Sequence, residues 1–235
     1  MILLTLVKSK ILKKKFKNLG VEKENFYERM EKILVKENKN FDIEASAGVF
    51  FEIKIKIPQK KISEVIKKLH QLGFKGDEDK IQSEKDFIFF SSYSPDLFRI
   101  REKEGNNKKY LLLVFHKKIN NLQVSDFVIK IQEENFYGEI FKELKNLTPK
   151  TELNTCIIEK RRSLFYDKKE NFVSIDIDVK KEENGQITNL GNFIEITTKS
   201  KKEILRLIEE FRVFGEVTTK SYYEMQSDFV QNIRS

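Results

Sequence analysis

The nine residues from Phe50 to Pro58, FFEIKIKIP, constrain the fold of this chain more than any other stretch. Apolar and charged side chains alternate here with a period of two, the pattern of a β-strand with two chemically different faces. The apolar face carries Phe51, Ile53, Ile55 and Ile57, and the charged face carries Glu52, Lys54 and Lys56. The apolar face predicts a packed core, whereas the charged face either meets solvent or lines a charged site.

The alternation recurs in several later segments, and between them apolar residues repeat at helical spacing. Strands are predicted at 86–90, 97–101, 110–115, 156–163, 172–179 and 192–197. Amphipathic helices are predicted between Pro58 and Phe74, at 136–147 and after Ser200, and capping-box patterns start at Ser200 and at Ser221. The sequence therefore predicts an α+β fold in which helices cover the apolar faces of antiparallel strands.

Length and composition limit the class of protein. The chain has 235 residues, which suits one domain, here residues 49–235, preceded by a lysine-rich helical extension over residues 1–48. The net charge of +8 indicates an anionic partner. Cys156 is the single cysteine, which excludes an intrachain disulfide, and no apolar stretch approaches the roughly 20 residues that span a bilayer. We therefore expect a cytoplasmic protein that does not enter a membrane.

Charged residues share the second face of the predicted strands, mostly in pairs that keep the two-residue spacing. They are Glu52 and Lys54, Arg99 and Arg101, Lys160 and Arg162, Asp176 and Asp178, and Glu195. One interpretation is a solvated sheet whose cross-strand ion pairs contribute roughly a few tenths of a kcal/mol each. The other is the lumen of a barrel that holds a polyphosphate, since guanidinium and ammonium groups bind phosphate oxygens and carboxylates hold a divalent cation.

Six short motifs, taken in order, resemble those of the CYTH superfamily, the triphosphate tunnel enzymes. FFEIKIKIP is similar to the E-x-E-x-K strand of that family, with Phe50 in the place of the first glutamate. FRIR at 98–101 resembles L-R-x-R, and IEKRRS at 158–163 resembles the K-x-R strand; further similarities lie at 84–90, 190–197 and 221–225. Within the superfamily, IEKRRSLFY and FIEITT are most similar to class IV adenylate cyclases, while thiamine and inorganic triphosphatases share the scaffold.

The resemblance implies an antiparallel eight-stranded β-barrel, the triphosphate tunnel, with surrounding helices and with Mg²⁺ or Mn²⁺ as cofactor. The implied metal ligands are Glu52 and Glu195, with Asp176 or Asp178. Catalytic roles fall to Glu52, Lys54 and Lys160. The expected substrate-binding cations are Lys54, Lys56, Arg99, Arg101, Lys160, Arg162 and either Lys117 or Lys118.

The activity implied is that of a metal-dependent enzyme acting on a nucleoside or organic triphosphate. It would be either a class IV-like adenylate cyclase, converting ATP to cyclic AMP and pyrophosphate, or a triphosphate hydrolase, and a homodimer is compatible with both. Phe50 leaves an alternative, a catalytically impaired protein with one carboxylate fewer that binds a polyphosphate or nucleotide. An RNA 5′-triphosphate is a further ligand class for this basic chain, although no motif of a dedicated nucleic-acid reader is present.

Overall fold

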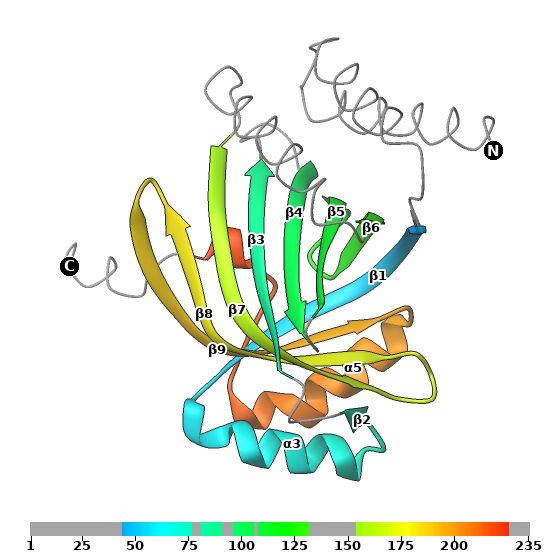
Figure 1. Cartoon of the computed structure of the whole chain (residues 1–235). Helices are drawn as coiled ribbons and strands as arrows, with labels where there is room; N and C mark the ends of the chain where they lie inside the picture. Colours follow the sequence, from blue (N-terminus) through cyan, green and yellow to red (C-terminus); the bar gives the residue numbers. More distant parts are fainter. Residues whose placement is uncertain (1–43, 77–80, 91–95, 106–107, 132–153, 226–235) are drawn as a thin grey trace, which may run out of the picture.

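The computed structural model describes residues 44–76, 81–90, 96–105, 108–131 and 154–225, and antiparallel strands dominate this part of the chain (Figure 1). The long strands are β1 (Glu44–Ile57), β3 (Gln82–Phe90), β4 (Asp96–Gly105), β5 (Lys108–Lys118), β6 (Gln123–Ile131), β7 (Asn154–Tyr166), β8 (Phe172–Glu183) and β9 (Gln186–Thr198). Two short strands, β2 (Lys75–Gly76) and β10 (Glu216–Thr218), pair with β7 and β1. The antiparallel barrel class expected from the sequence is confirmed.

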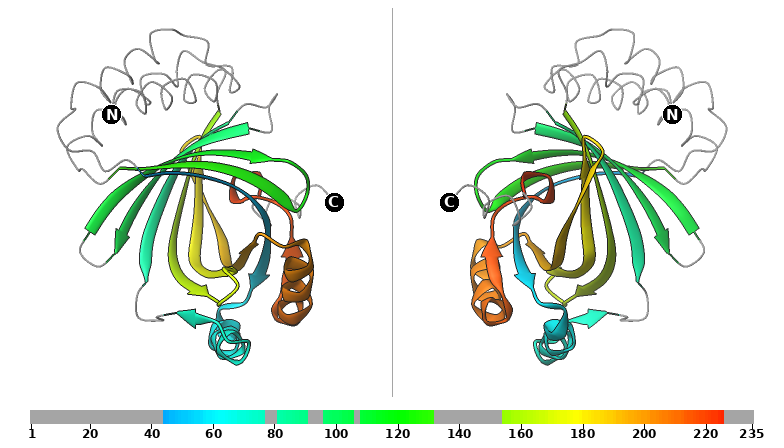
Figure 2. Two further views of the ribbon diagram at one scale, coloured as in Figure 1. Left: turned by 90° about the vertical axis from the view of Figure 1, so that its right-hand side faces the viewer. Right: turned by 90° about the vertical axis from the view of Figure 1, so that its left-hand side faces the viewer.

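The sheet closes on itself because β1 pairs with two different strands. The order is β10-β1-β6-β5-β4-β3-β7-β8-β9, and a further pairing joins β1 to β9. Residues 44–51 of β1 pair with β6, and residues 51–57 pair with β9. At this fork the amide of Glu52 donates to the carbonyl of Leu122 at 2.8 Å. The curled sheet therefore encloses an interior, as the two side views show (Figure 2).

Two helices lie together beneath the strands in Figure 1 and cover the apolar face of β1. They are α3 (Ile62–Gln71), entered through the 3-10 turn η1 (Gln59–Lys61), and α5 (Lys201–Phe211), followed by η3 (Arg212–Phe214). The core between helices and sheet includes Ile53 and Ile55 of β1, Leu69 of α3 and Phe211 of α5. Burying one row of β1 against helices turns its charged row toward the interior of the ring. None of the described helices has the length and apolar character needed to cross a bilayer.

Several ends of elements follow from local sequence. Ser200 caps α5, because its hydroxyl accepts the amide hydrogen of Glu203 at 3.3 Å. Gly73, with φ of 83°, follows α3 and takes a left-handed conformation that favours glycine. Asn184 and Gly185, with φ of 52° and 75°, form the tight turn between β8 and β9.

The structure also differs from the sequence-based prediction. β1 begins at Glu44, inside the helical extension predicted for residues 1–48, because β6 supplies backbone partners along that stretch. β6 itself was not predicted. The capping box at Ser221 is present, but it opens only the 3-10 turn η4 (Tyr222–Glu224) within the described chain. The predicted helix at 136–147 and the N-terminal extension lie outside the described residues, so the domain division stays a prediction.

Candidate functional site

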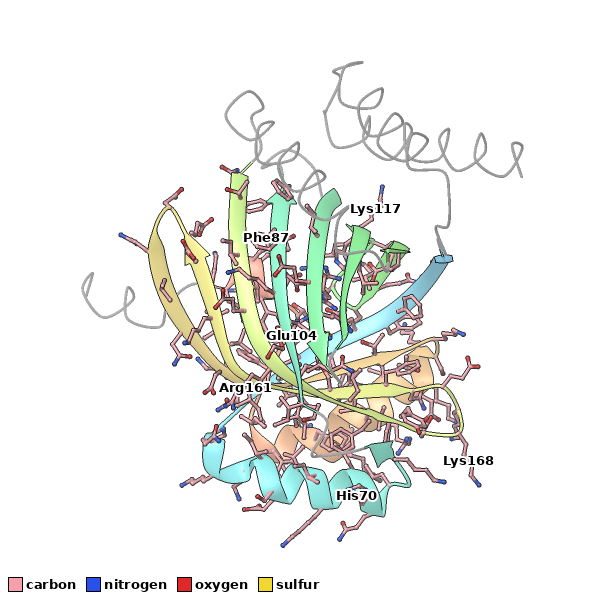
Figure 3. All side chains as sticks on the ribbon, in the orientation of Figure 1. His70, Phe87, Glu104, Lys117, Arg161 and Lys168 are labelled. Carbon is pink, nitrogen blue, oxygen red and sulfur yellow. The ribbon has the colours of Figure 1, made fainter. Side chains whose placement is uncertain are left out.

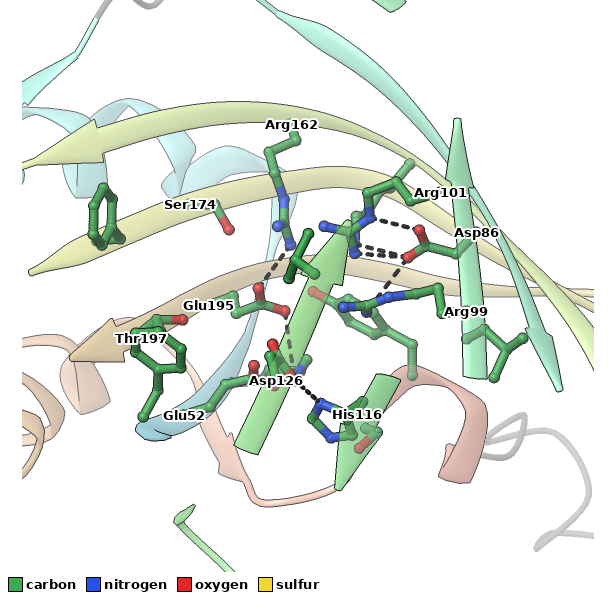
Figure 4. Close-up of a pocket in the computed structure, with 18 of the residues that line it drawn as sticks. Glu52, Asp86, Arg99, Arg101, His116, Asp126, Arg162, Ser174, Glu195 and Thr197 are labelled. Atoms are coloured by element: carbon green, nitrogen blue, oxygen red, sulfur yellow. Dashed lines mark hydrogen bonds and ion pairs between the residues drawn. The ribbon is translucent and has the colours of Figure 1, made fainter. Parts of the chain in front are cut away.

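The ring encloses a cavity of about 350 Å³ that is lined mainly by side chains of the long strands (Figure 4). Among the described residues, five cationic side chains line it: Lys54, Arg99, Arg101, Lys160 and Arg162. Four carboxylates line it as well: Glu52, Asp86, Asp126 and Glu195. The residues of the charged strand faces thus surround one common cavity.

On the β3 and β4 side, carboxylates hold the arginines in place. Arg101 donates from Nε and Nη2 to the two oxygens of Asp86, at 2.6 and 2.8 Å. Behind this pair, Glu84 is 2% exposed and lies 2.7 Å from the ammonium of Lys103. Burial would raise the pKa of Asp86, but Arg101, Lys160 and Arg99 outweigh it, so the pKa lies below its ordinary value. Bidentate pairs of this kind fix the guanidinium orientation.

A second network joins β7, β8 and β9 to the C-terminal turn. Arg162 donates from Nε and Nη2 to the two oxygens of Asp176, both at 2.6 Å, and from Nη2 to Glu195 at 2.9 Å. The hydroxyl of Tyr222 donates to the same aspartate at 2.7 Å. Asp176 is fully buried behind the cavity wall, so it positions Arg162 and Tyr222 rather than facing the cavity.

The two buried lysines of the cavity differ in their surroundings. The ammonium of Lys54 contacts Glu52 and lies 3.3 Å from Glu195, and these carboxylates outweigh burial and raise the pKa of Lys54. Burial, together with Arg162 and Arg101, lowers the pKa of Lys160 despite nearby carboxylates. Both ammonium groups lie about 5 Å from the centre of the Tyr222 ring, at 5.1 and 5.0 Å.

Two polar atoms of the cavity wall have no hydrogen-bond partner within the described part of the chain. They are Nε of Arg99 and Oγ of Ser174, and both are buried. Buried polar groups are nearly always satisfied, and leaving one unpaired costs about 1–3 kcal/mol. A ligand with acceptor oxygens would satisfy both atoms.

Most residues that the sequence suggested for the site do meet in the cavity. Glu52, Lys54, Arg99, Arg101, Lys160, Arg162 and Glu195 line it. Sequence reasoning missed the buried Glu84 and Lys103, although they keep the alternation of Asp86 and Arg101. It also gave no role to His116, which lines the cavity from β5 opposite Asp126 on β6.

Five suggested residues do not line the cavity, and the first of them is Asp176, which lies behind its wall. Asp178 is exposed and pairs with Arg161, because a bulge between Asp176 and Val179 reverses the alternation; it therefore does not line the cavity with Glu52 and Glu195. The remaining three, which do not line the cavity, are Lys56, Lys117 and Lys118. Lys117 is exposed (Figure 3), and Lys118 lies 3.2 Å from Glu224. Among the described side chains of β5, it is His116 that lines the cavity.

The carboxylates suit a divalent cation only in combination with a phosphate ligand. Within the described ranges, no three His, Cys, Asp or Glu side chains gather as a group that could hold a metal ion. Glu52 and Glu195 lie on the paired strands β1 and β9, on either side of the Lys54 ammonium. Mg²⁺ is commonly held by one or two carboxylates together with substrate phosphates, so these two oxygen donors fit that mode.

Comparison with known proteins places the fold. No family model and no curated protein matches the chain. The PH1819 protein from Pyrococcus horikoshii is 21% identical, with a TM-score of 0.52 over 79% of this chain and 99% of its own. A conserved hypothetical protein from Pyrococcus furiosus is 19% identical, with a TM-score of 0.54 over 75% of this chain and 99% of its own. These similarities show that the fold occurs in other solved structures.

A further solved structure comes from Hippeastrum and is described as a candidate adenylyl cyclase with a dominant triphosphatase activity. It is 12% identical, with a TM-score of 0.46 over 78% of this chain and 94% of its own. A likeness at this level says nothing about the activity of the present chain.

Proposed function

We propose that this chain binds the triphosphate group of a nucleoside or other organic triphosphate inside the ring and acts on it with Mg²⁺ or Mn²⁺. The observation that carries the proposal is the convergence of five cationic side chains on one cavity, four of them buried, with Arg99 Nε and Ser174 Oγ still without partners among the described residues. A triphosphate has the acceptor oxygens and the negative charge that such a wall recognises.

Each group of residues has a distinct part in this proposal. Arg99, Arg101, Lys160 and Arg162 would bind phosphate oxygens. Glu52 and Glu195 would hold the divalent cation against the phosphates, while Lys54, between them, would move to a phosphate oxygen. In phosphoryl and nucleotidyl transfer the protein mainly positions the reactants and neutralises developing charge. The charged side chains of the cavity would serve both functions.

Two reactions would use a triphosphate-binding site of this kind. In a cyclase the ribose 3′-hydroxyl attacks the α-phosphate of ATP and pyrophosphate leaves, and in a triphosphatase water attacks the γ-phosphate and orthophosphate leaves. The position of the metal and of a proton acceptor relative to the phosphates decides between them. A cytoplasmic location and a homodimer remain predictions, as does an RNA 5′-triphosphate as the ligand.

A second candidate function is binding without turnover, and one observation favours it. Phe50 lines the cavity, and its ring lies so close over Gly48 that a Cβ there would be 2.4 Å from the ring. An aromatic ring therefore occupies the wall beside Glu52, where a third carboxylate would strengthen metal binding.

Product analysis separates these outcomes. Purified protein is incubated with ATP, GTP, thiamine triphosphate or tripolyphosphate, each with Mg²⁺, Mn²⁺ or EDTA. Lys160→Met and Glu52→Gln are the test variants, and Lys180→Met, an exposed lysine on β8, is the matched control. Cyclic nucleotide with pyrophosphate would establish a cyclase, and orthophosphate would establish a triphosphatase. In either case the product must be lost in Lys160→Met and kept in Lys180→Met.

Binding measurements cover the case without product. Calorimetric binding of tripolyphosphate that requires Lys160, with no turnover of any substrate, would favour the binding function. Absence of both binding and turnover would refute the proposal.

A further inference from the structure

His116 and Asp126 form a pair at the cavity wall that the proposed function does not use. They lie directly opposite each other on β5 and β6. Nδ1 of His116 is 2.7 Å from Oδ1 of Asp126, and the exposed fractions of the two side chains are 8% and 20% (Figure 4). Both residues line the cavity, so this is a largely buried histidine held by a carboxylate beside the arginines.

The pair fixes which nitrogen of the ring is available. When the carboxylate accepts the hydrogen on Nδ1, Nε2 on the other side of the ring is left for another partner. Burial would raise the pKa of Asp126, but the hydrogen bond and charge of His116, with Arg99 and Arg101, lower it. Asp126 therefore remains ionised near neutral pH and can accept the hydrogen on Nδ1 of His116.

Other charged and titratable side chains line the same cavity from several elements. They are Glu52 and Lys54 on β1, Asp86 on β3, Arg99 and Arg101 on β4, Lys160 and Arg162 on β7, Glu195 on β9, and Tyr222 and Tyr223 of the C-terminal turn. The pKa of Lys54 is raised, as are those of both tyrosines, so these three keep their ordinary charge near neutral pH. Imidazole is the side chain that ordinarily changes charge between about pH 5 and 8.

We infer that His116 is a phosphate-binding residue whose imidazolium donates Nε2–H to an oxygen of the bound triphosphate, with Asp126 as its positioning residue. This rests on the proposed function. Triphosphate binding is then strongest when His116 is protonated and weakens as the pH rises through the range in which imidazole loses its proton. One charge-assisted hydrogen bond corresponds to about tenfold in affinity.

Calorimetry with tripolyphosphate and a fixed Mg²⁺ concentration tests the inference. The chain contains two histidines, and His70→Gln, in α3 outside the cavity, is the matched control for His116→Gln. Between about pH 5.5 and about pH 8, wild type and His70→Gln should lose about tenfold more affinity than His116→Gln. Tripolyphosphate and Lys160 are the same in all three proteins, so any effect of their titration on affinity cancels when the proteins are compared. Asp126→Asn should move the loss of affinity to lower pH, because the carboxylate no longer stabilises the imidazolium.

Nuclear magnetic resonance of the wild-type protein gives a readout that needs no variant at His116. Tripolyphosphate should raise the titration midpoint of the His116 ring and leave that of His70 unchanged. If this midpoint stays unchanged while binding still requires Lys160, the inference is wrong and the proposed function stands. The same holds if wild type and His116→Gln show equal pH dependence of binding. If wild type binds no tripolyphosphate at any pH, the proposed function fails and the inference fails with it.

Discussion

Asp176 and Asp178 provide a paired test of the buried charge network. Both lie on β8, and each pairs with an arginine of β7. Asp176 is fully buried, bonded twice to Arg162 and once to the Tyr222 hydroxyl. Asp178 contacts Arg161 at the surface, where the exposed fractions of the two side chains are 51% and 52%. Aspartate-to-asparagine substitution therefore makes the same chemical change in a buried pair and in an exposed one.

The two substitutions should differ severalfold in how much they lower the free energy of unfolding. Removing one partner of a buried ion pair costs about 3–5 kcal/mol, because the other charge stays buried without compensation. Arg162 keeps its bond to Glu195, so the free energy of unfolding of Asp176→Asn should fall by about 3 kcal/mol, the lower end of this range. Asp178→Asn should cost less than about 1 kcal/mol. Its φ of 53° is one that asparagine also adopts, so the backbone adds no penalty.

Urea unfolding at neutral pH measures both values. The midpoint of Asp176→Asn should fall strongly at an unchanged denaturant slope, while that of Asp178→Asn should stay close to wild type. If the two variants lose equal stability within about 1 kcal/mol, Asp176 is not the buried partner of Arg162, and the account of the cavity wall is wrong.

Three further predictions concern local features. Ser200→Ala should lower the free energy of unfolding by about 1 kcal/mol, seen in thermal melts, because α5 loses its cap; no change would contradict the capping bond. The pKa values of Glu84, Asp86 and Glu195 are lowered in the folded protein, so the unfolded chain binds protons more tightly. The stability that they contribute is present above their ordinary pKa of about 4 and is lost as the pH falls below it, and a flat urea midpoint between about pH 6 and about pH 3 would refute this. Burial raises the pKa of Cys156 to about 12, so a disulfide reagent at mildly alkaline pH should label it slowly in folded protein and rapidly in urea; fast labelling of the folded form would show that the thiol is accessible.

The sequence predicted much of the cavity wall because strand alternation is a local property. Once Ile53 and Ile55 are buried against the helices, Glu52 and Lys54 must point inward, and the same rule places Arg99 and Arg101. The rule holds as long as the strand remains regular.

The features that the sequence did not predict depend on partners distant along the chain. Asp178 leaves the expected face because the extra residue of a bulge reverses the alternation of side chains along β8. Nothing in the sequence around the bulge indicates it. His116 and Asp126 are ten positions apart, and only the register of β5 against β6 brings them together. The first part of β1, from Glu44, extends because β6 lies beside it. In each case tertiary pairing decides the structure.

The double pairing of β1 also has a consequence for the order of folding. β3 to β6 pair with their neighbours in sequence, and so do β7 to β9, whereas β1 must bring Lys54 opposite Glu195 near the other end of the described chain. Because distant contacts carry the larger entropic cost of loop closure, we expect the two meanders to form first and β1 to complete the ring last. Glu52 and Lys54 of β1 form part of the cavity wall, so the cavity is complete only after this step. A bound triphosphate would therefore slow unfolding and leave the folding rate unchanged.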